Sequence, residues 1–178
     1  MKLYFDSGVH KVLFLNFEVL EMLNSKKQSG FSLVELMIVI AIIALIIAVG
    51  IPAWQAMVRN GNESTAIQTL NTLRTCQISY AGRHQGKFAP TFADLVKTGC
   101  IEGDKFSSET PVINGYVYTM KVEQPSGSKP AFFSINADPQ VSEGTMATGN
   151  RHFYIDSSVG TIKYTEENRP AKADDPSI

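Results

Sequence analysis

The chain has 178 residues and is close to neutral, with 16 Lys and Arg against 17 Asp and Glu and a formal net charge of −1. This length allows one domain of modest size plus an anchor. The part after Trp54 is also near neutral, with 12 basic and 13 acidic residues. That balance excludes a basic face suited to nucleic acid and an acidic tail.

The first 25 residues do not have the pattern of a secretory signal. Their apolar cluster, Val12 to Leu15, is short, and it is closely followed by the polar residues Asn16 and Glu18. A secretory signal needs a longer uninterrupted apolar region. We therefore look for the targeting information further along the chain.

The stretch from Phe31 to Ile51 is a candidate membrane-spanning helix. It has 21 residues and one charge, Glu35, and a helix of that length measures roughly 31 Å, close to the thickness of a bilayer core. Because backbone groups inside lipid must bond to one another, we expect this segment to be helical. Lys26 and Lys27 precede it, and no basic residue follows before Arg59. This asymmetry predicts a cytoplasmic N-terminus and an exported C-terminal side.

The residues in and around this segment resemble the prepilin family, the type IV pilins and the pseudopilins of type II secretion. The matching pattern is Lys-Lys-Gln-Ser-Gly at 26–30, Phe-Ser-Leu-Val-Glu at 31–35, the apolar run and Pro52. The resemblance implies cleavage after Gly30 and N-methylation of Phe31 by a prepilin peptidase and methyltransferase. It also implies that an inner-membrane assembly platform builds identical subunits into a helical filament.

Family leaders are short and basic, which bears on residues 1–30. A leader that begins at Met22 would have nine residues, with two lysines and no acidic residue. We therefore expect Met22 to be the initiator and residues 1–21 to be an over-extended start. A genuine long leader is the alternative interpretation.

Glu35 needs a partner if it lies in lipid, because a carboxylate there costs about 2.5 to 3.5 kcal/mol. No Lys or Arg lies between Lys27 and Arg59. Cleavage would create one cation nearby, the α-amine of Phe31, within the same chain or on a neighbouring chain. The resemblance implies the pair between chains, which would recruit a subunit and set its register. In the alternative, Glu35 lies at the lipid interface and reaches water.

The helix is predicted to continue to about Tyr80 as an amphipathic half that packs on a sheet. Its apolar stripe has spacings of three and four and comprises Ile67, Leu70, Leu73, Cys76 and Tyr80. Polar residues such as Gln77 are assigned to the other face. Gly50 and Pro52, and the run 60–62, are weak points, because proline removes a helical hydrogen bond. The resemblance implies that the region before the proline can unwind in a filament; a mild kink is the alternative.

The rest of the chain predicts a small antiparallel sheet after a loop-like region at 81–115. That region contains one short helix, Thr91–Lys97. Four strands are expected, at Tyr116–Val122, Ala131–Ala137, Arg151–Asp156 and Thr161–Tyr164. Residues 166–178 are polar and contain two prolines, so we expect a frayed tail. The predicted fold class is α+β and pilin-like, a long N-terminal helix packed on a small C-terminal antiparallel sheet.

Cys76 and Cys100 are both expected outside the cytoplasm, where a disulfide is favoured. The bond would close a loop of about 25 residues, which the chain-entropy relation values at roughly 3 kcal/mol. Two free, buried thiols are the alternative. Many pilins have a disulfide nearer the C-terminus, so this spacing departs from the family pattern.

The sequence predicts no catalytic, cofactor-binding or metal-binding residues, because His84, His152 and the cysteines lack metal-ligand spacing. We therefore expect a structural protein, not an enzyme, divided into a leader at 1–30, a transmembrane and assembly half-helix at 31–54 and a periplasmic or extracellular head at 55–178. The favoured function is a type IV pilus subunit that is a single-pass inner-membrane precursor, in contact with lipid before assembly, and then part of a cell-surface filament. Alternatives are a type II pseudopilin, a minor pilin or a single membrane-tethered binding domain.

Overall fold

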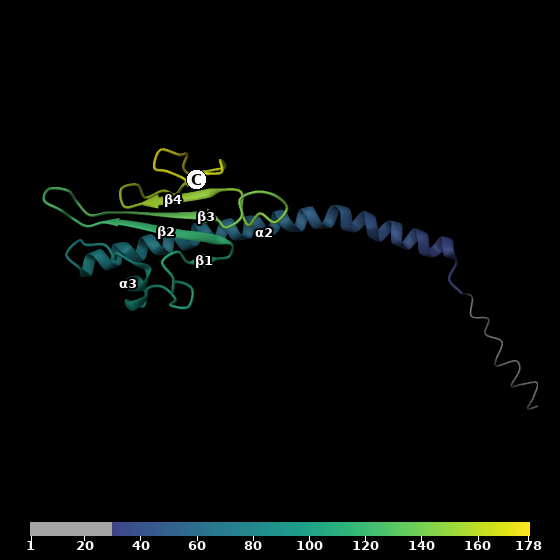
Figure 1. Cartoon of the computed structure of the whole chain (residues 1–178), viewed down its shortest axis with the longest axis horizontal. Coiled ribbons are helices and arrows are strands. Elements are labelled where there is room, and N and C mark those ends of the chain that lie inside the picture. Colours follow the sequence, from purple (N-terminus) through teal and green to yellow (C-terminus); the bar gives the residue numbers. More distant parts are fainter. Residues whose placement is uncertain (1–29) are drawn as a thin grey trace, which may run out of the picture. The chain divides into compact units, whose positions relative to one another are not determined.

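The computed structural model describes residues 30–178, so the predictions about the leader before Gly30, including the start at Met22, lie outside the described residues. The chain divides into two units, one ending at Ile47 and the other beginning at Ala48. Helix α2, Leu33–Arg83, has residues in both. It is followed by the short helix α3, Phe92–Lys97, and by five strands (Figure 1).

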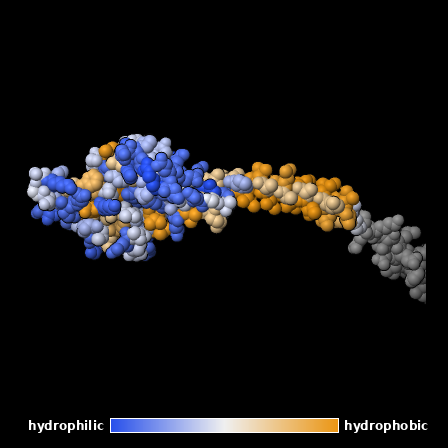
Figure 2. All heavy atoms as spheres, turned by 45° about the horizontal axis from the view of Figure 1, so that its top comes forward, coloured by the Kyte–Doolittle hydropathy of each residue, from blue (hydrophilic) through white to orange (hydrophobic). Residues whose placement is uncertain are grey.

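The first unit is described from Gly30 onward, and its described part consists of a short non-helical segment and the first turns of α2. The helix begins after Ser32, whose carbonyl accepts a hydrogen bond from the N–H of Leu36 at 3.1 Å. In the described part of the chain, α2 is the helix long and apolar enough to cross a membrane. Figure 2 shows its early turns as almost continuously hydrophobic on the face in view. The expected long apolar helix is confirmed.

The second half of α2 buries one face against a sheet, as its apolar stripe predicts. Leu70, Leu73 and Cys76 are buried, and Ile67 and Tyr80 are partly buried against the same core. The helix continues three residues beyond the predicted end, to Arg83. Positive φ angles at Gln85 and Gly86 then turn the chain away from helical geometry.

The sheet is antiparallel with the strand order β1-β2-β3-β4-β5. Its strands are β1 Val112–Ile113, β2 Tyr116–Glu123, β3 Phe132–Pro139, β4 His152–Asp156 and β5 Lys163–Thr165. The four predicted strands are confirmed within two residues at each end. Strand β1 was not predicted, because two residues are too short for an alternation to be visible. Asn114 and Gly115, both at positive φ, form the tight turn that joins β1 to β2.

Alternate residues of the central strands form the core under α2. Tyr116 and Tyr118 of β2, Phe133 and Ile135 of β3 and Phe153 of β4 are fully buried. The aromatic rings lie in tilted or edge-on pairs, such as Tyr116 with Phe153 at 5.8 Å between centroids. This core belongs entirely to the second unit, so the second unit has the means to fold around its own side chains.

The C-terminal segment, residues 166–178, is not a frayed tail, and that prediction was wrong. Arg169 holds Asp175 through two hydrogen bonds of 2.8 and 2.7 Å. Nδ2 of Asn136 donates to the carbonyl of Ala171 at 2.8 Å, and Ala171 is buried. The N–H of Tyr164 donates to the carbonyl of Pro176 at 2.9 Å. Composition suggested disorder because these partners lie 6 to 35 residues apart and leave no local pattern.

The short helix α3 is confirmed, with Thr91 as its N-cap. The N–H of Asp94 donates to Oγ1 of Thr91 at 3.2 Å, and that hydroxyl donates to Oδ2 of Asp94 at 2.7 Å. This reciprocal arrangement satisfies one of the free N–H groups of the first turn. Lys97 also donates to Oδ1 of Asp94, at 3.0 Å. The hydrogen bond from the Thr91 hydroxyl, and secondly that from Lys97, lower the pKa of the Asp94 carboxyl.

Candidate processing and assembly site

The predicted cleavage junction, Gly30–Phe31, lies in the short segment just before α2 and is exposed. The side chain of Phe31 is 83% exposed, and a methyl group added at Gly30 would meet nothing within 4 Å. Nothing in the fold therefore demands glycine at position 30. A requirement for a small residue there would have to come from an enzyme that binds the backbone.

Glu35 lies in the first turn of α2, three residues after the helix-initiating Ser32. The sequence Ser-x-x-Glu at the start of a helix is the spacing of a capping box, in which the glutamate faces the N–H of the capping serine. A negative charge there also interacts favourably with the helix dipole. Within residues 30–178, no hydrogen bond or ion pair engages the Glu35 carboxylate. It is an exposed carboxylate next to exposed apolar side chains.

The apolar side chains of α2 that follow Glu35 are not buried against other residues in the described part of the first unit, residues 30–47. Every large apolar residue from Leu36 to Ile47 is exposed, by 43 to 68%. A helix that is apolar on all sides is typical of a segment buried in a membrane or among other helices. The arrangement therefore suits contact with lipid or with the helices of other chains, with Glu35 as its one charge.

Gly50 and Pro52 lie inside α2, which is helical without interruption from Leu33 to Arg83. Pro52 has no N–H, so the carbonyl of Ala48 lacks its usual helical donor. A side chain at Gly50 would meet nothing within 4 Å. The predicted unwinding concerns an assembled filament, and it stays a prediction.

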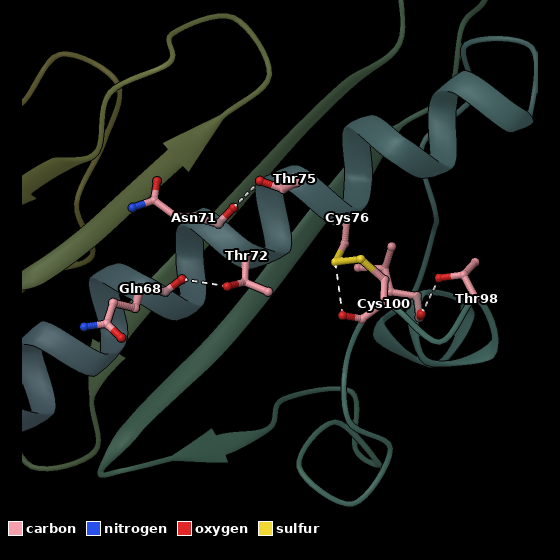
Figure 3. The surroundings of a disulfide bond; sticks show 8 residues. Gln68, Asn71, Thr72, Thr75, Cys76, Thr98 and Cys100 are labelled. Atoms are coloured by element: carbon pink, nitrogen blue, oxygen red, sulfur yellow. Dashed lines mark hydrogen bonds between the residues drawn. A yellow bond between two sulfur atoms is a disulfide. The ribbon is translucent and has the colours of Figure 1, made fainter.

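Cys76 and Cys100 form a disulfide, the pairing that the sequence predicts (Figure 3). Their Cα atoms are 5.8 Å apart, and the bond ties α2 to the segment that follows α3. Beside it, the hydroxyls of Thr72 and Thr75 donate back to carbonyls one turn earlier in α2. The disulfide thus fixes the loop after α3 against the helix.

A buried ion pair, Glu63–Arg151, is a structural feature that the sequence reasoning missed. Oε2 of Glu63 accepts from Nε of Arg151 at 2.7 Å, and Oε1 accepts from the N–H groups of Asn150 and Arg151 at 2.8 and 3.3 Å. The guanidinium also lies over the rings of Phe153 and Tyr164. Glu63 continues the buried stripe by one turn before Ala66. The position of Glu63, four residues before Ile67 of the apolar stripe, could have indicated this pair. A carboxylate on the buried face of a helix needs hydrogen-bond donors.

Gln77 is buried, so its assignment to the polar face was wrong. Its Nε2 donates to the carbonyl of Ala89 at 2.9 Å, and its Oε1 accepts from the N–H of Ala89 at 2.8 Å. The side-chain amide therefore satisfies both backbone groups of a residue in the loop before α3. A polar residue can occupy this position of the core face because both of its polar atoms have partners.

The structure thus groups the predicted residues into three separate places in the chain. Gly30, Phe31 and Glu35 lie together at the start of α2, Gly50 and Pro52 lie within the helix, and the cysteines are bonded to each other. In the region that the structure describes, no three His, Cys, Asp or Glu residues group as metal ligands. His152 and Asp138 form a pair, with 2.6 Å between Nδ1 and Oδ1.

Comparison with known proteins points to the same N-terminal region. Residues 25–51 match the prokaryotic N-terminal methylation motif. The chain is 45% identical over 60 residues to prepilin peptidase-dependent protein D of Escherichia coli (strain K12), a match that covers 34% of this chain and 41% of the relative. It is 36% identical over 92 residues to the type IV major pilin protein PilE of Neisseria gonorrhoeae, covering 51% of this chain and 54% of that protein.

These matches span about half or less of each curated relative. No solved structure matches the chain at a comparable level. The family-model match is confined to residues 25–51, and each curated relative matches only part of the chain.

Proposed function

We propose that this chain, a member of the type IV pilin and pseudopilin family by its N-terminal methylation motif and its relatives, is a structural subunit of a type IV pilus. In this proposal a prepilin peptidase cleaves after Gly30 and methylates Phe31. The chain is first a single-pass precursor in the inner membrane, with its N-terminus cytoplasmic and residues 55–178 exported as a head. An assembly platform then transfers identical subunits from lipid into a helical filament.

The observation that carries the proposal is the exposure of the large apolar side chains in the first half of α2. Its large side chains are exposed around the whole helix, so exposure to water would be costly at about 25 cal/mol per Å² of apolar surface. Lipid covers them in the precursor, and the same half-helices of neighbouring subunits cover them in the filament. The second unit contributes a folded surface and requires nothing from this half for its core.

Glu35 has a specific role in this scheme. Cleavage creates the Phe31 amine, and Glu35 of an adjacent subunit pairs with it when both leave the lipid. The pair offsets the cost of burying the carboxylate among the apolar helices of the filament. It also sets the axial register between neighbouring helices, since only one displacement brings the two charges together.

A sheared-filament preparation tests the proposal. Mass spectrometry should find this chain as a repeated main component, beginning with N-methylated Phe31 and lacking residues 1–30. A minor pilin would be present in trace amounts among other subunits, and a pseudopilin would be missing from surface filaments while secretion depended on it. A membrane-tethered binding domain would stay in the inner membrane with an unprocessed N-terminus, and that result would overturn the proposal.

A further inference from the structure

The loop between β3 and β4, residues 140–151, lies against α2 in the part of the helix that follows the apolar run (Figure 1). Nδ2 of Asn62 donates to the carbonyl of Thr148 at 2.9 Å. One turn earlier, Nη2 of Arg59 donates to the carbonyl of Gly144 at 3.4 Å. The loop therefore follows the helix toward its N-terminus from Thr148 to Gly144.

Four large apolar side chains are uncovered in this part of the second unit. Trp54, Met57 and Val58 lie on one face of α2, at spacings of three and four, and are 65, 71 and 42% exposed. Met146, between the two anchored loop residues, is 80% exposed. We call these four residues the collar. The loop is hydrogen-bonded to Arg59 and Asn62 of α2. The collar therefore combines three residues of the helix with one residue of the loop beside it.

The length of the uncharged run indicates where a bilayer would lie along α2. A hydrocarbon core of about 30 Å corresponds to about 20 helical residues. The run Leu36–Gln55 has this length and no charged residue. If lipid hydrocarbon covers this run, Glu35 lies in the headgroup layer and avoids burial. Trp54 then lies at the opposite hydrocarbon boundary, where tryptophan is enriched in membrane proteins.

The same placement brings the loop to the membrane surface. Arg59 is four residues after Gln55, about 6 Å along the helix, and the headgroup layer is roughly 5 to 7 Å thick on each side. Helical side chains point toward the helix N-terminus, so Met57 and Val58 are directed into this layer. Arg59, the first cation after the run, places a positive charge at the level of the lipid phosphates. An anionic lipid surface would repel the carboxylate of Glu143. That carboxylate accepts a hydrogen bond of 3.0 Å from Nδ2 of Asn168, in the C-terminal segment.

We propose that, before assembly, the collar contacts the headgroup layer of the phospholipid bilayer that α2 spans. The contact orients the second unit on the membrane surface, and it is lost when the subunit leaves the membrane. The occupant is lipid because the helical part of the collar, Trp54, Met57 and Val58, forms the C-terminal end of a stretch that has no charged residue from Leu36 to Val58. This proposal rests on the proposed function, since it requires a membrane-spanning precursor.

Trp54 is the only tryptophan of the chain, which permits a direct fluorescence test. The full-length chain is reconstituted at a low protein-to-lipid ratio into phosphatidylethanolamine and phosphatidylglycerol vesicles that carry a nitroxide quencher on the headgroup. Trp54→Phe combined with Met146→Trp reports on the loop. Trp54→Phe combined with Ile78→Trp is the control, because Ile78 is exposed on the same helix but about 35 Å beyond Gln55.

We expect the tryptophan at position 146 to be quenched at least about threefold more than that at position 78. If the two positions were quenched equally while Trp54 was quenched in the unaltered chain, the proposed contact between the collar and the headgroups would be wrong. The proposed function would not be affected. If Trp54 were not quenched either, the chain would not span the bilayer and the proposed function would fail. If position 146 became shielded only in assembled filaments, the occupant would be a second copy and the assignment to lipid would be wrong.

Discussion

The two units use apolar residues in opposite ways. In the first unit, the large apolar side chains from Phe31 to Ile47 are exposed, and Glu35 is the one charge among them. In the second unit, aromatic side chains such as Phe133 and Phe153 are fully buried, and the buried Glu63 has three donors. Both units are rich in apolar residues, but only the second unit buries its aromatic core side chains within its own fold.

This difference separates the requirements of assembly from those of folding. The buried side chains of Glu63 and Gln77 are hydrogen-bonded to groups inside the second unit, so changes there should alter its stability. The first unit has no partner of its own among the described residues, so changes there should alter processing and assembly and leave the second unit folded. Substitutions in each unit test this separation, beginning with the largest expected effect.

Gly30→Val should abolish cleavage, because a branched side chain would keep the peptidase from the backbone at the junction. The fold offers no reason for the loss, since a side chain at Gly30 meets nothing within 4 Å. Gly30→Ala is the matched control and should retain partial cleavage. Immunoblots of membrane fractions measure the ratio of precursor to mature chain. Filaments made of Gly30→Val subunits that begin at Phe31 would contradict the prediction.

Glu63→Ala should destabilise the second unit by about 3 kcal/mol, because it leaves a partly buried Arg151 and two backbone N–H groups without an acceptor. Glu63→Gln should cost less, since an amide oxygen can still accept from the backbone. Denaturant unfolding of the full chain in detergent micelles measures both values. A change below about 0.5 kcal/mol in the alanine variant would show that this ion pair does not hold the loop to α2.

Replacement of both cysteines, Cys76→Ser with Cys100→Ser, should also lower the free energy of unfolding, by about 3 kcal/mol in the chain-entropy relation. The cost falls on the second unit, and cleavage after Gly30 should be unchanged. Thiol labelling of the unreduced, denatured wild-type chain provides the check on the bond itself. Reaction at both cysteines would refute the disulfide in the mature protein.

The C-terminal segment gives the smallest effect, and it depends on pH. Hydrogen bonds from Arg169 first, and from the N–H of Lys172 second, lower the pKa of Asp175 from its ordinary value of 3.8 to about 2. A carboxyl whose folded-state pKa is lowered stabilises the fold above its unfolded pKa and loses that contribution as the pH falls. Stability should therefore decline between about pH 4 and pH 2. Asp175→Asn should remove this part of the pH dependence in thermal unfolding curves, and an unchanged curve would argue against the pair.

The elements with local patterns were predictable, and the features that join distant residues were not. The helix and four strands follow from runs of apolar residues and from spacings within single segments, and Cys76 and Cys100 are the chain's two cysteines. The junction at Gly30 and Phe31 is likewise a contiguous motif. By contrast, Gln77 is stabilised by Ala89, which lies 12 residues away, and Glu63 by Arg151, 88 residues away. Such partners become visible only when the chain is folded, so residue polarity and helical spacing assigned Gln77 to the polar face.

The most direct test of the separation compares Glu35→Gln with the wild-type chain in one cell preparation. Glutamine retains the size of the side chain and its suitability for a capping box, and it removes only the charge. We predict that the variant is inserted, cleaved after Gly30 and folded with an unchanged free energy of unfolding, but that it accumulates in the inner membrane and yields no sheared filaments. A normal filament yield from Glu35→Gln would contradict the account, because it would show that the carboxylate charge does not drive assembly.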